Sequence, residues 1–387
     1  MNAEEKLLLK VCRCYFNNEP LTAEPDIDWN CFYILAKYHS LIGICHCVFS
    51  RGGSKAPEKV KALFQDKFFD LVYLYNCQEN TLSDIRVCLR GAEIPFIVFK
   101  GAVLRQMYSV PESRSMGDID ILITDADRSK AKKHLENAGF RCDAVNGTVR
   151  EFSRKGIHLE VHTRLFNEFS ESAFSDAFEN ARFDNYEGRL EINYHLAYLI
   201  AHIAHHYKFY GAGIRMILDL ATVIKTNKID LDKVLNLLAQ IELDVFAKEM
   251  LTVCFRWFGE GKDFGRDISK TEKYLLKYGT FGELNQNKGA IITRKELEAG
   301  KSVSSPALTK LRLAFPPYDK MKNIPYIKFI EGRPWLTPYA WCYRFIYNFK
   351  NKKNFVLSTI KNIDDEKTQA AAAAELEYFE EIGLWHS

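Results

Sequence analysis

The sequence has little excess charge and no long apolar run. Its 53 lysines and arginines nearly balance 50 aspartates and glutamates, so the net charge of the 387 residues is +3. A chain so close to neutral is not expected to coat nucleic acid or to bind membranes through a polybasic patch. No stretch approaches the roughly 20 apolar residues of a membrane helix. Residues 1–16 contain acids before their apolar stretch and no small-residue cleavage site, so we expect a cytoplasmic protein with no signal peptide and no membrane partner.

The sequence also lacks the cysteine spacing of a zinc ribbon. Its ten cysteines include two C-x-C pairs, Cys12/Cys14 and Cys45/Cys47, where zinc ribbons use C-x-x-C. A secreted disulfide scaffold is usually shorter and denser in cysteine. We therefore expect reduced, buried thiols. The alternative is a metal site formed by Cys45, His46 and Cys47.

What the sequence does contain is a folded protein's share of apolar residues, 47%, with 13% aromatics. Helical spacing of apolar residues dominates both ends of the chain, whereas short apolar runs between them are typical of buried strands. We therefore expect an α+β protein, with a small mixed-sheet core flanked by helical regions. The expected divisions are an N-terminal helical region at 1–90, a core at 91–185 and a C-terminal helical domain at 186–387.

Four segments of the core are predicted to be strands. They are residues 94–99, 118–123, 149–153 and 157–162. In the second of these, Asp118 and Asp120 point to one face while Ile119 and Ile121 point to the core, because side chains alternate along a strand. Two adjacent carboxylates repel each other unless a cation lies between them, and oxygen ligands suit magnesium. The alternative is a solvent-facing polar edge, since D-x-D alone is common.

The fourth predicted strand adds a third acid. Its polar residues His158, Glu160 and His162 share one face. If this strand lies beside the one with Asp118 and Asp120, then Glu160 completes a cluster of three carboxylates. Such a cluster can hold two magnesium ions about 4 Å apart, the arrangement that supports in-line attack on phosphorus.

Lys100 and Gly101 lie between the first predicted strand and a short helix predicted over 102–108. A glycine there lets the backbone approach a phosphate, and the lysine adds positive charge. Arg114 precedes the D-x-D pair by four residues, and it either clamps a phosphate or lies on the loop surface. Arg105 is a weaker candidate for the same role.

The string FKGAVLRQMYSVPESRSMGDIDILI, followed by GIHLEVH, resembles the DNA polymerase beta nucleotidyltransferase superfamily. Within it, the string looks like an uncharacterised bacterial family in which Lys100-Gly101 replaces the usual glycine-serine. The match covers residues 95–165, and residues 195–220 are similar more loosely. The resemblance implies a nucleotidyltransferase core in which Asp118, Asp120 and Glu160 bind the metal.

From these patterns we expect magnesium-dependent transfer of a nucleoside monophosphate from a nucleoside triphosphate to an acceptor, with release of pyrophosphate. Lys100, Gly101 and Arg114 are the expected phosphate-binding residues. The acceptor is open, but the near-neutral charge favours a small molecule or protein over long nucleic acid. The alternative function is a catalytically inactive protein that keeps the fold and binds a nucleotide or a partner.

Two further groups of residues have alternative interpretations. His195, His202 and His206 fit one helical face, which indicates a packed helix, a wall of the acceptor pocket or a zinc hydrolase site. Arg215 and Asp219, four residues apart, form either a helix pair or part of the site. The aromatic residues from 335 to 343 predict helix packing, with a base-stacking surface as the alternative.

Overall fold

The computed structural model describes residues 1–22, 26–166, 174–279, 314–322, 324–351 and 366–385. The chain divides into two compact units, Met1–Gly282 and Glu283–Ser387. The boundaries predicted after residues 90 and 185 both fall inside the first unit and stay predictions. Within the described residues, every helix is too short or too polar to cross a membrane.

The first unit opens with helices that the sequence pattern predicted. They are α1 (Ala3–Asn17), α2 (Trp29–Tyr38), α3 (Ile42–Ser50) and α4 (Glu58–Gly91). Asn2 caps α1 by accepting a hydrogen bond from the backbone of Glu5, and Asp28 caps α2 in the same way. These caps fix where the helices begin.

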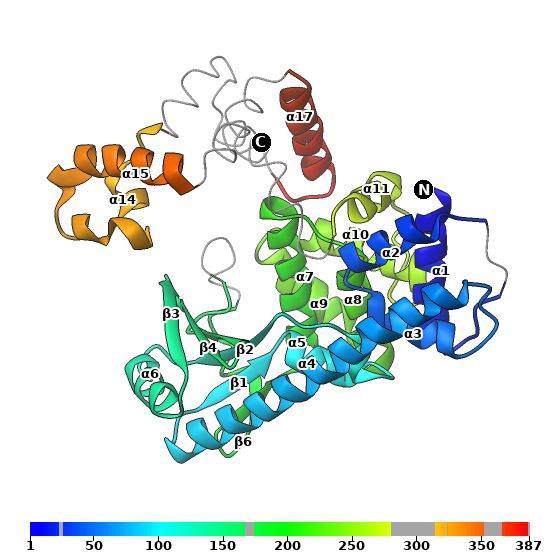
Figure 1. The fold of residues 1–387 in the computed structure, drawn as a ribbon, viewed down its shortest axis with the longest axis horizontal. Helices are drawn as coiled ribbons and strands as arrows, with labels where there is room; N and C mark the ends of the chain where they lie inside the picture. The colour runs from blue at the N-terminus through cyan, green and yellow to red at the C-terminus, as the bar shows by residue number, and fades with distance from the viewer. Residues whose placement is uncertain (23–25, 167–173, 280–313, 323, 352–365, 386–387) are drawn as a thin grey trace. The chain divides into compact units, whose positions relative to one another are not determined.

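A seven-stranded mixed sheet follows (Figure 1). Its strands are β1 (Phe96–Phe99), β2 (Asp118–Ile123), β3 (Arg141–Asn146), β4 (Val149–Arg154), β5 (Ile157–His162), β6 (Ala181–Asp184) and β7 (Glu187–Leu190). Their order is β3-β4-β5-β2-β1-β7-β6. The mixed α/β architecture with helical flanks is confirmed. Strands β3, β6 and β7 were not predicted from the sequence, and β7 extends the sheet beyond residue 185 by pairing in parallel with β1.

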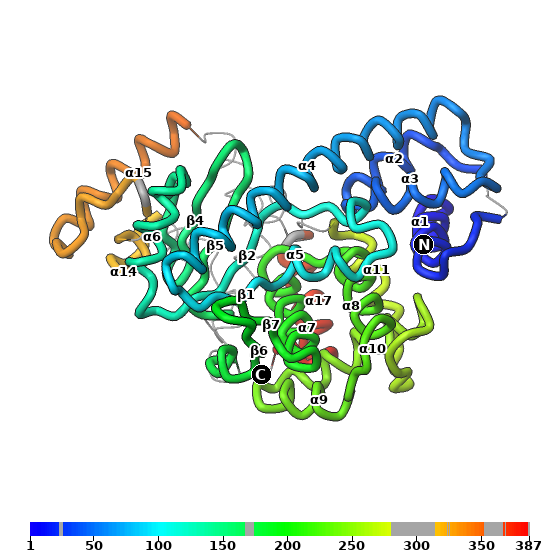
Figure 2. Tube along the Cα trace, turned by 90° about the horizontal axis from the view of Figure 1, so that it is seen from below, coloured from blue at the N-terminus to red at the C-terminus, as the bar shows by residue number. Residues whose placement is uncertain are grey.

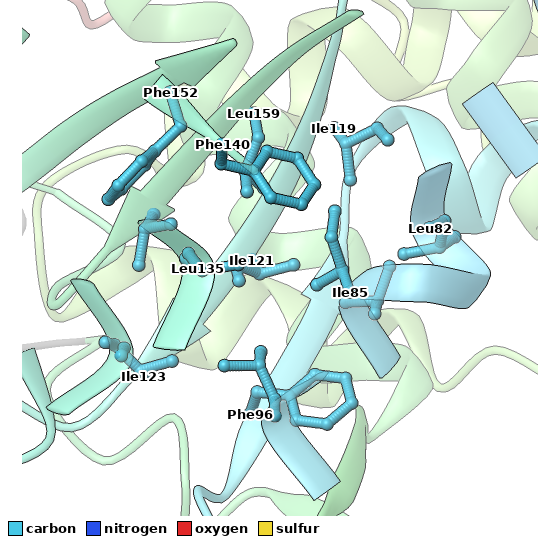
Figure 3. Packing of buried hydrophobic residues seen from close by; sticks show 14 of the residues in the cluster. Leu82, Ile85, Phe96, Ile119, Ile121, Ile123, Leu135, Phe140, Phe152 and Leu159 are labelled. Atoms are coloured by element: carbon cyan, nitrogen blue, oxygen red, sulfur yellow. The ribbon is translucent and has the colours of Figure 1, made fainter. Parts of the chain in front are cut away.

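One face of the sheet is apolar and carries α4 and α6 (Arg128–Asn137). Ile119, Ile121 and Ile123 of β2 are fully buried there, as the alternation predicted. They pack in one cluster with Ile85 of α4 and Leu135 of α6 (Figure 3). A cluster of this kind stabilises the sheet because large apolar side chains leave water together.

The opposite face carries the polar residues of β2 and β5. Phe99 at the end of β1 contacts Tyr198 of α7 (Ile192–Phe209), with ring centroids 5.6 Å apart. The chain between β1 and β2 forms α5 (Gly101–Leu104) and two 3-10 turns, η1 (Arg105–Met107) and η2 (Pro111–Ser113). Helices α7 and α8 (Ile214–Thr226) lie next to α5 (Figure 2). The polar face of the sheet therefore meets helices from a distant part of the chain.

Three more helices complete the first unit: α9 (Leu231–Ala239), α10 (Asp244–Phe258) and α11 (Ser269–Lys277). The second unit contains α14 (Tyr318–Met321), η3 (Pro325–Ile330), η4 (Pro334–Leu336), α15 (Thr337–Asn351) and α17 (Glu366–Glu381).

The aromatic stretch of the second unit is less buried than predicted. The indole of Trp341 donates a hydrogen bond to the Pro316 carbonyl and packs against a small core. Trp335 and Tyr339, in contrast, are 72% and 63% exposed. The ring of Tyr339 still packs against Phe329, with centroids 5.7 Å apart, so the prediction of helix packing is wrong for Trp335 but not for Tyr339.

All ten cysteines are free thiols, as predicted. Five of them, including Cys12, Cys14, Cys45 and Cys47, are buried. Cys31 and Cys342 are exposed, so burial was not a correct expectation for every cysteine.

Candidate functional site

The register between β2 and β5 brings the three predicted acids to one face of the sheet. The strands are parallel neighbours, which meets the condition set by the sequence pattern, with Asp120 opposite Glu160 and Asp118 opposite His158. Residues directly opposite each other on neighbouring strands share a face. Asp118, Asp120 and Glu160 therefore gather at the polar face, away from the isoleucine cluster.

The six residues that the sequence singled out line one cavity of about 320 Å³. They are Lys100, Gly101, Arg114, Asp118, Asp120 and Glu160. A volume of this size lies in the range of small-molecule sites, about 300–1,000 Å³. The structure thus places candidate phosphate-binding and metal-binding residues around one space.

Lys100 stands between β1 and α5 in a conformation that favours glycine. Its φ is 51° and its ψ is −128°, values that cost a residue with a side chain about 1–3 kcal/mol. The ammonium lies 2.7 Å from Oδ1 of Asp120. Burial opposes the charge of this ammonium, but Asp120 and the other acids hold the pKa of Lys100 above its ordinary value. Lys100 therefore binds a carboxylate in this structure.

His162 is the residue of this cluster whose role the sequence analysis left open. Its Nε2 lies 3.0 Å from Oδ1 of Asp120 and 3.1 Å from Oε2 of Glu160. One ligand atom from each of these three residues lies within 4.8 Å of the others. Burial and Lys100 oppose a charge on His162, but its two carboxylate partners raise its pKa above the ordinary value.

No other group of three such ligands occurs among the described residues. Cys45, His46 and Cys47 do not form one, and the ring of His46 stacks on Phe68 with centroids 4.5 Å apart. The interpretation of this tripeptide as a metal site is therefore wrong.

The acids perturb one another because they are close and partly removed from water. The charge of Asp120, then burial and the charge of Glu160 raise the pKa of Asp118 to about 6, against a smaller opposing effect of Lys100. Burial also acts on Asp120, which is 2% exposed. Lys100 and the hydrogen bond from His162 nevertheless hold the pKa of Asp120 below its usual range.

Arg114 is buried, so the alternative that it lies on the loop surface is wrong. Its Nε and Nη2 donate to the two oxygens of Asp219 at 2.8 and 2.9 Å. The hydroxyl of Tyr108 donates to the same carboxylate at 2.7 Å. This pairing fixes the loop before β2 against α8. The Nη1 atom is turned toward Gly101, where an added Cβ would lie 3.2 Å from it.

The absence of a side chain at Gly101 leaves space for a neighbouring side chain, and it also lets the backbone approach a phosphate. A Cβ at this position would lie 2.8 Å from the side chain of Met116. Arg105, the weaker phosphate candidate, is 1% exposed and donates to Gln78 and Glu79 of α4. Arg105 therefore holds the turn after α5 to the long helix.

Helix α7 brings histidines to the cavity wall. His202 and His206 line the cavity, and their Nε2 atoms lie 3.1 Å apart. His195 does not line the cavity, and its Nε2 has no hydrogen-bond partner among the described residues. The three imidazoles do not form a group of metal ligands. The zinc hydrolase interpretation is therefore wrong, and burial lowers the pKa of His206 to about 3.

Arg215 and Asp219 both line the cavity, but each has a partner in the loop before β2. Arg215 donates through Nη1 to the carbonyl of Ser115 at 2.8 Å, while Asp219 holds Arg114. Sequence reasoning missed Tyr198, which is fully buried against Phe99, beside Lys100. Its position four residues before His202 places it on the same face of α7, although it does not itself line the cavity.

Comparisons with known proteins gave a family match and a match to a solved structure. Residues 25–259, more than half of the chain, match the family model described as uncharacterised nucleotidyltransferase. No curated protein matches the chain. A solved structure of the antibiotic-resistance factor ANT(2'')-Ia is 12% identical, with a TM-score of 0.35, over 43% of this chain and 91% of that one. On the family match, the chain belongs to the uncharacterised nucleotidyltransferase family.

Proposed function

We propose that this chain transfers a nucleoside monophosphate from a nucleoside triphosphate to an acceptor hydroxyl, with a divalent ion, Mg²⁺, as cofactor. The observation that carries the proposal is the gathering of Asp118, Asp120 and Glu160 on one face of the sheet, at a cavity also lined by Lys100. Family membership supports nucleotidyl transfer in general.

The donor set fits a magnesium ion. Carboxylate oxygens are the ligands that magnesium takes in proteins. Asp118, Asp120 and Glu160 also carry more negative charge than Lys100 offsets, as the raised pKa of Asp118 indicates. These three residues would hold two ions. When bound, such ions neutralise the triphosphate and lower the pKa of the attacking hydroxyl.

The residues of the chain divide the remaining work. Lys100, Gly101 and the Nη1 side of Arg114 would hold the phosphates. In the reaction, the acceptor oxygen bonds to the α-phosphorus, and the bond from that phosphorus to pyrophosphate breaks. The hydroxyl proton passes to Glu160, whose side chain is 31% exposed and so accessible to an acceptor. His202 and His206 would form the acceptor side of the cavity.

The test is release of pyrophosphate from each nucleoside triphosphate with Mg²⁺, in the presence of a cell extract as the source of acceptor. We expect Asp118→Asn and Asp120→Asn each to lower the rate by about 100-fold or more, because each removes a proposed metal ligand. Asp125→Asn is the matched control, since Asp125 follows the same strand with a side chain 78% exposed. Its rate should match that of the wild type.

Two results would contradict the proposal. Activity that survives the double change Asp118→Asn/Asp120→Asn would exclude metal-dependent transfer at this site. Nucleotide binding without any release of pyrophosphate would favour the alternative of an inactive nucleotide-binding or partner-binding protein. With a labelled triphosphate, the position of the label after reaction identifies the acceptor as a small molecule, a protein or an RNA.

A further inference from the structure

The imidazole of His162 lies at the centre of the acidic cluster. It follows Glu160 by two residues on β5, so both side chains extend from the same face of the sheet. Its Nε2 is 3.0 Å from Oδ1 of Asp120 and 3.1 Å from Oε2 of Glu160. His162 is 6% exposed and Asp120 is 2% exposed, so these atoms meet inside the protein.

These spacings match those of neighbouring ligands around one ion. Ligands that lie about 2.1 Å from a metal and at right angles to each other are separated by about 3 Å. Nε2 of His162 therefore stands in the same relation to each carboxylate oxygen as a third ligand would.

We propose that His162 is itself a ligand, through Nε2, of an ion held by Asp120 and Glu160. The inference rests on the proposed function, because it concerns the metal of the same site. A nitrogen ligand shifts the preference of the site away from Mg²⁺, which favours an all-oxygen set, toward a transition-metal ion that accepts imidazole, and Mn²⁺ is the probe of that shift. Asp118 would share the second ion with the other two acids of the cluster.

Lys100 neutralises the carboxylate that this ion would bind. Its ammonium binds Oδ1 of Asp120 at 2.7 Å, the same oxygen that His162 contacts. A cation therefore already balances Asp120, and an arriving metal ion takes over that role. The lysine side chain, 17% exposed, is then free to turn to the triphosphate.

The test is binding of Mn²⁺ and of Mg²⁺ to the full chain without nucleotide, measured by titration calorimetry. Pulsed electron paramagnetic resonance of the Mn²⁺-loaded chain detects a directly bound nitrogen. We expect the wild type to bind Mn²⁺ at least tenfold more tightly than Mg²⁺ and to show the nitrogen coupling. His162→Asp should abolish the nitrogen coupling and reduce the ratio of Mn²⁺ affinity to Mg²⁺ affinity, because it creates an all-oxygen ligand set.

Two further variants separate ligation from structure. His162→Gln keeps a hydrogen-bond donor for the two carboxylates but offers no imidazole nitrogen, so it should also lose the coupling. His158→Gln is the matched control, because His158 is an exposed histidine on the same strand. His158→Gln should keep both the nitrogen coupling and the ratio of Mn²⁺ affinity to Mg²⁺ affinity. Thermal unfolding of each variant verifies that it is folded.

The inference is overturned if Mn²⁺ does not bind, if it binds without nitrogen coupling, or if the coupling persists in both His162 variants. Pyrophosphate release measured in parallel distinguishes this failure from that of the proposed function. Release without nitrogen coupling would leave nucleotidyl transfer standing and remove His162 as a ligand. Nitrogen coupling without release of pyrophosphate would support His162 as a ligand and contradict nucleotidyl transfer.

Discussion

Lys100 combines an unfavourable backbone with a favourable side-chain contact. Its φ of 51° belongs to a region that glycine enters without cost, yet the position carries a lysine that is ion-paired to Asp120. Strain of this kind persists where the surrounding structure holds it, and it is concentrated at functional sites. The turn from β1 into α5 is what directs the ammonium to the acids.

Replacing Lys100 by glycine and by alanine measures that strain. Both variants lose the ammonium, so the difference between their free energies of unfolding isolates the cost of the backbone conformation at this position. We expect the glycine variant to be more stable than the alanine variant by about 1–2 kcal/mol, because only alanine keeps the steric conflict of a Cβ. Urea unfolding gives the two free energies.

The control is the neighbouring position in α5. At Ala102, whose backbone is helical, glycine should be less stable than alanine by about 1 kcal/mol, the ordinary order. If alanine were more stable than glycine at position 100, as is expected at position 102, the turn would not be strained.

At the scale of elements, the N-terminal helices hold the loop that leads into β2. Gly43 of α3 packs so closely on η2 that an added Cβ would lie 2.5 Å from the carbonyl oxygen of Ser113. The hydroxyl of Tyr15 in α1 is 2.8 Å from Oγ of Ser113. Two helices distant in sequence therefore fix the segment between α5 and the strand with Asp118.

Gly43→Ala should destabilise the protein by about 2 kcal/mol or more, because the new methyl group overlaps backbone that cannot move independently. Chemical unfolding measures the change. Gly91→Ala at the end of α4 is the comparison, since a Cβ there meets nothing within 4 Å. That variant should be unchanged or more stable by up to about 1 kcal/mol, and an equal loss in both would contradict the packing argument.

Strands β2 and β5 were predicted because polar residues alternate with buried isoleucine, leucine or valine along β5 and over residues 118–121 of β2, a pattern that the sequence shows directly. Strand β3, in contrast, is mostly exposed, and β6 and β7 have four residues each. Such strands exist because a neighbour supplies hydrogen bonds, and the sequence of the strand alone does not indicate that neighbour.

The same reasoning applies to the site. The faces of Asp118, Asp120 and Glu160 follow from alternation along two strands, but their approach also required the two strands to be neighbours, which the sequence left as a condition. The partner of Arg114 was not, because Asp219 is 105 residues away and only the packing of α8 brings it near. The position of Lys100 on Asp120 likewise depends on a backbone angle that no local pattern specifies.

At the scale of the whole molecule, buried histidines couple stability to pH. His39 accepts a hydrogen bond from the backbone of Ile214 at Nδ1, and its Nε2 is 3.3 Å from the Leu276 carbonyl. The contact at Nδ1 requires the neutral imidazole, because a protonated Nδ1 cannot accept a hydrogen bond. Burial lowers the pKa of His39 to about 4, against a smaller opposing effect of the Leu276 bond, and burial alone lowers that of His195 to about 4.

A histidine whose pKa is about 4 when folded and about 6.5 when unfolded binds its proton preferentially in the unfolded state. Its contribution to stability is complete above pH 6.5 and is lost as the pH falls to 4. We expect each of the two residues to account for a loss of about 3 kcal/mol across that window. Urea unfolding at a series of pH values measures the loss.

His39→Gln should make the dependence on pH less steep, whatever its effect at pH 7.5. The half-exposed His134 of α6 provides the control, and His134→Gln should leave the slope as in the wild type. A slope unaffected by the change at His39 would show that this residue does not carry the acid sensitivity.

The placement of β2 inside the sheet, between β1 and β5, has a consequence for folding. A slip of this strand by one residue would turn Asp118 and Asp120 toward Ile85 and Leu135 and bring isoleucines to the cavity. Unpaired carboxylates in that apolar layer would be penalised heavily. The slipped register would therefore be much less stable than the native one, so the carboxylates proposed for chemistry would also favour the correct pairing of β2 during folding.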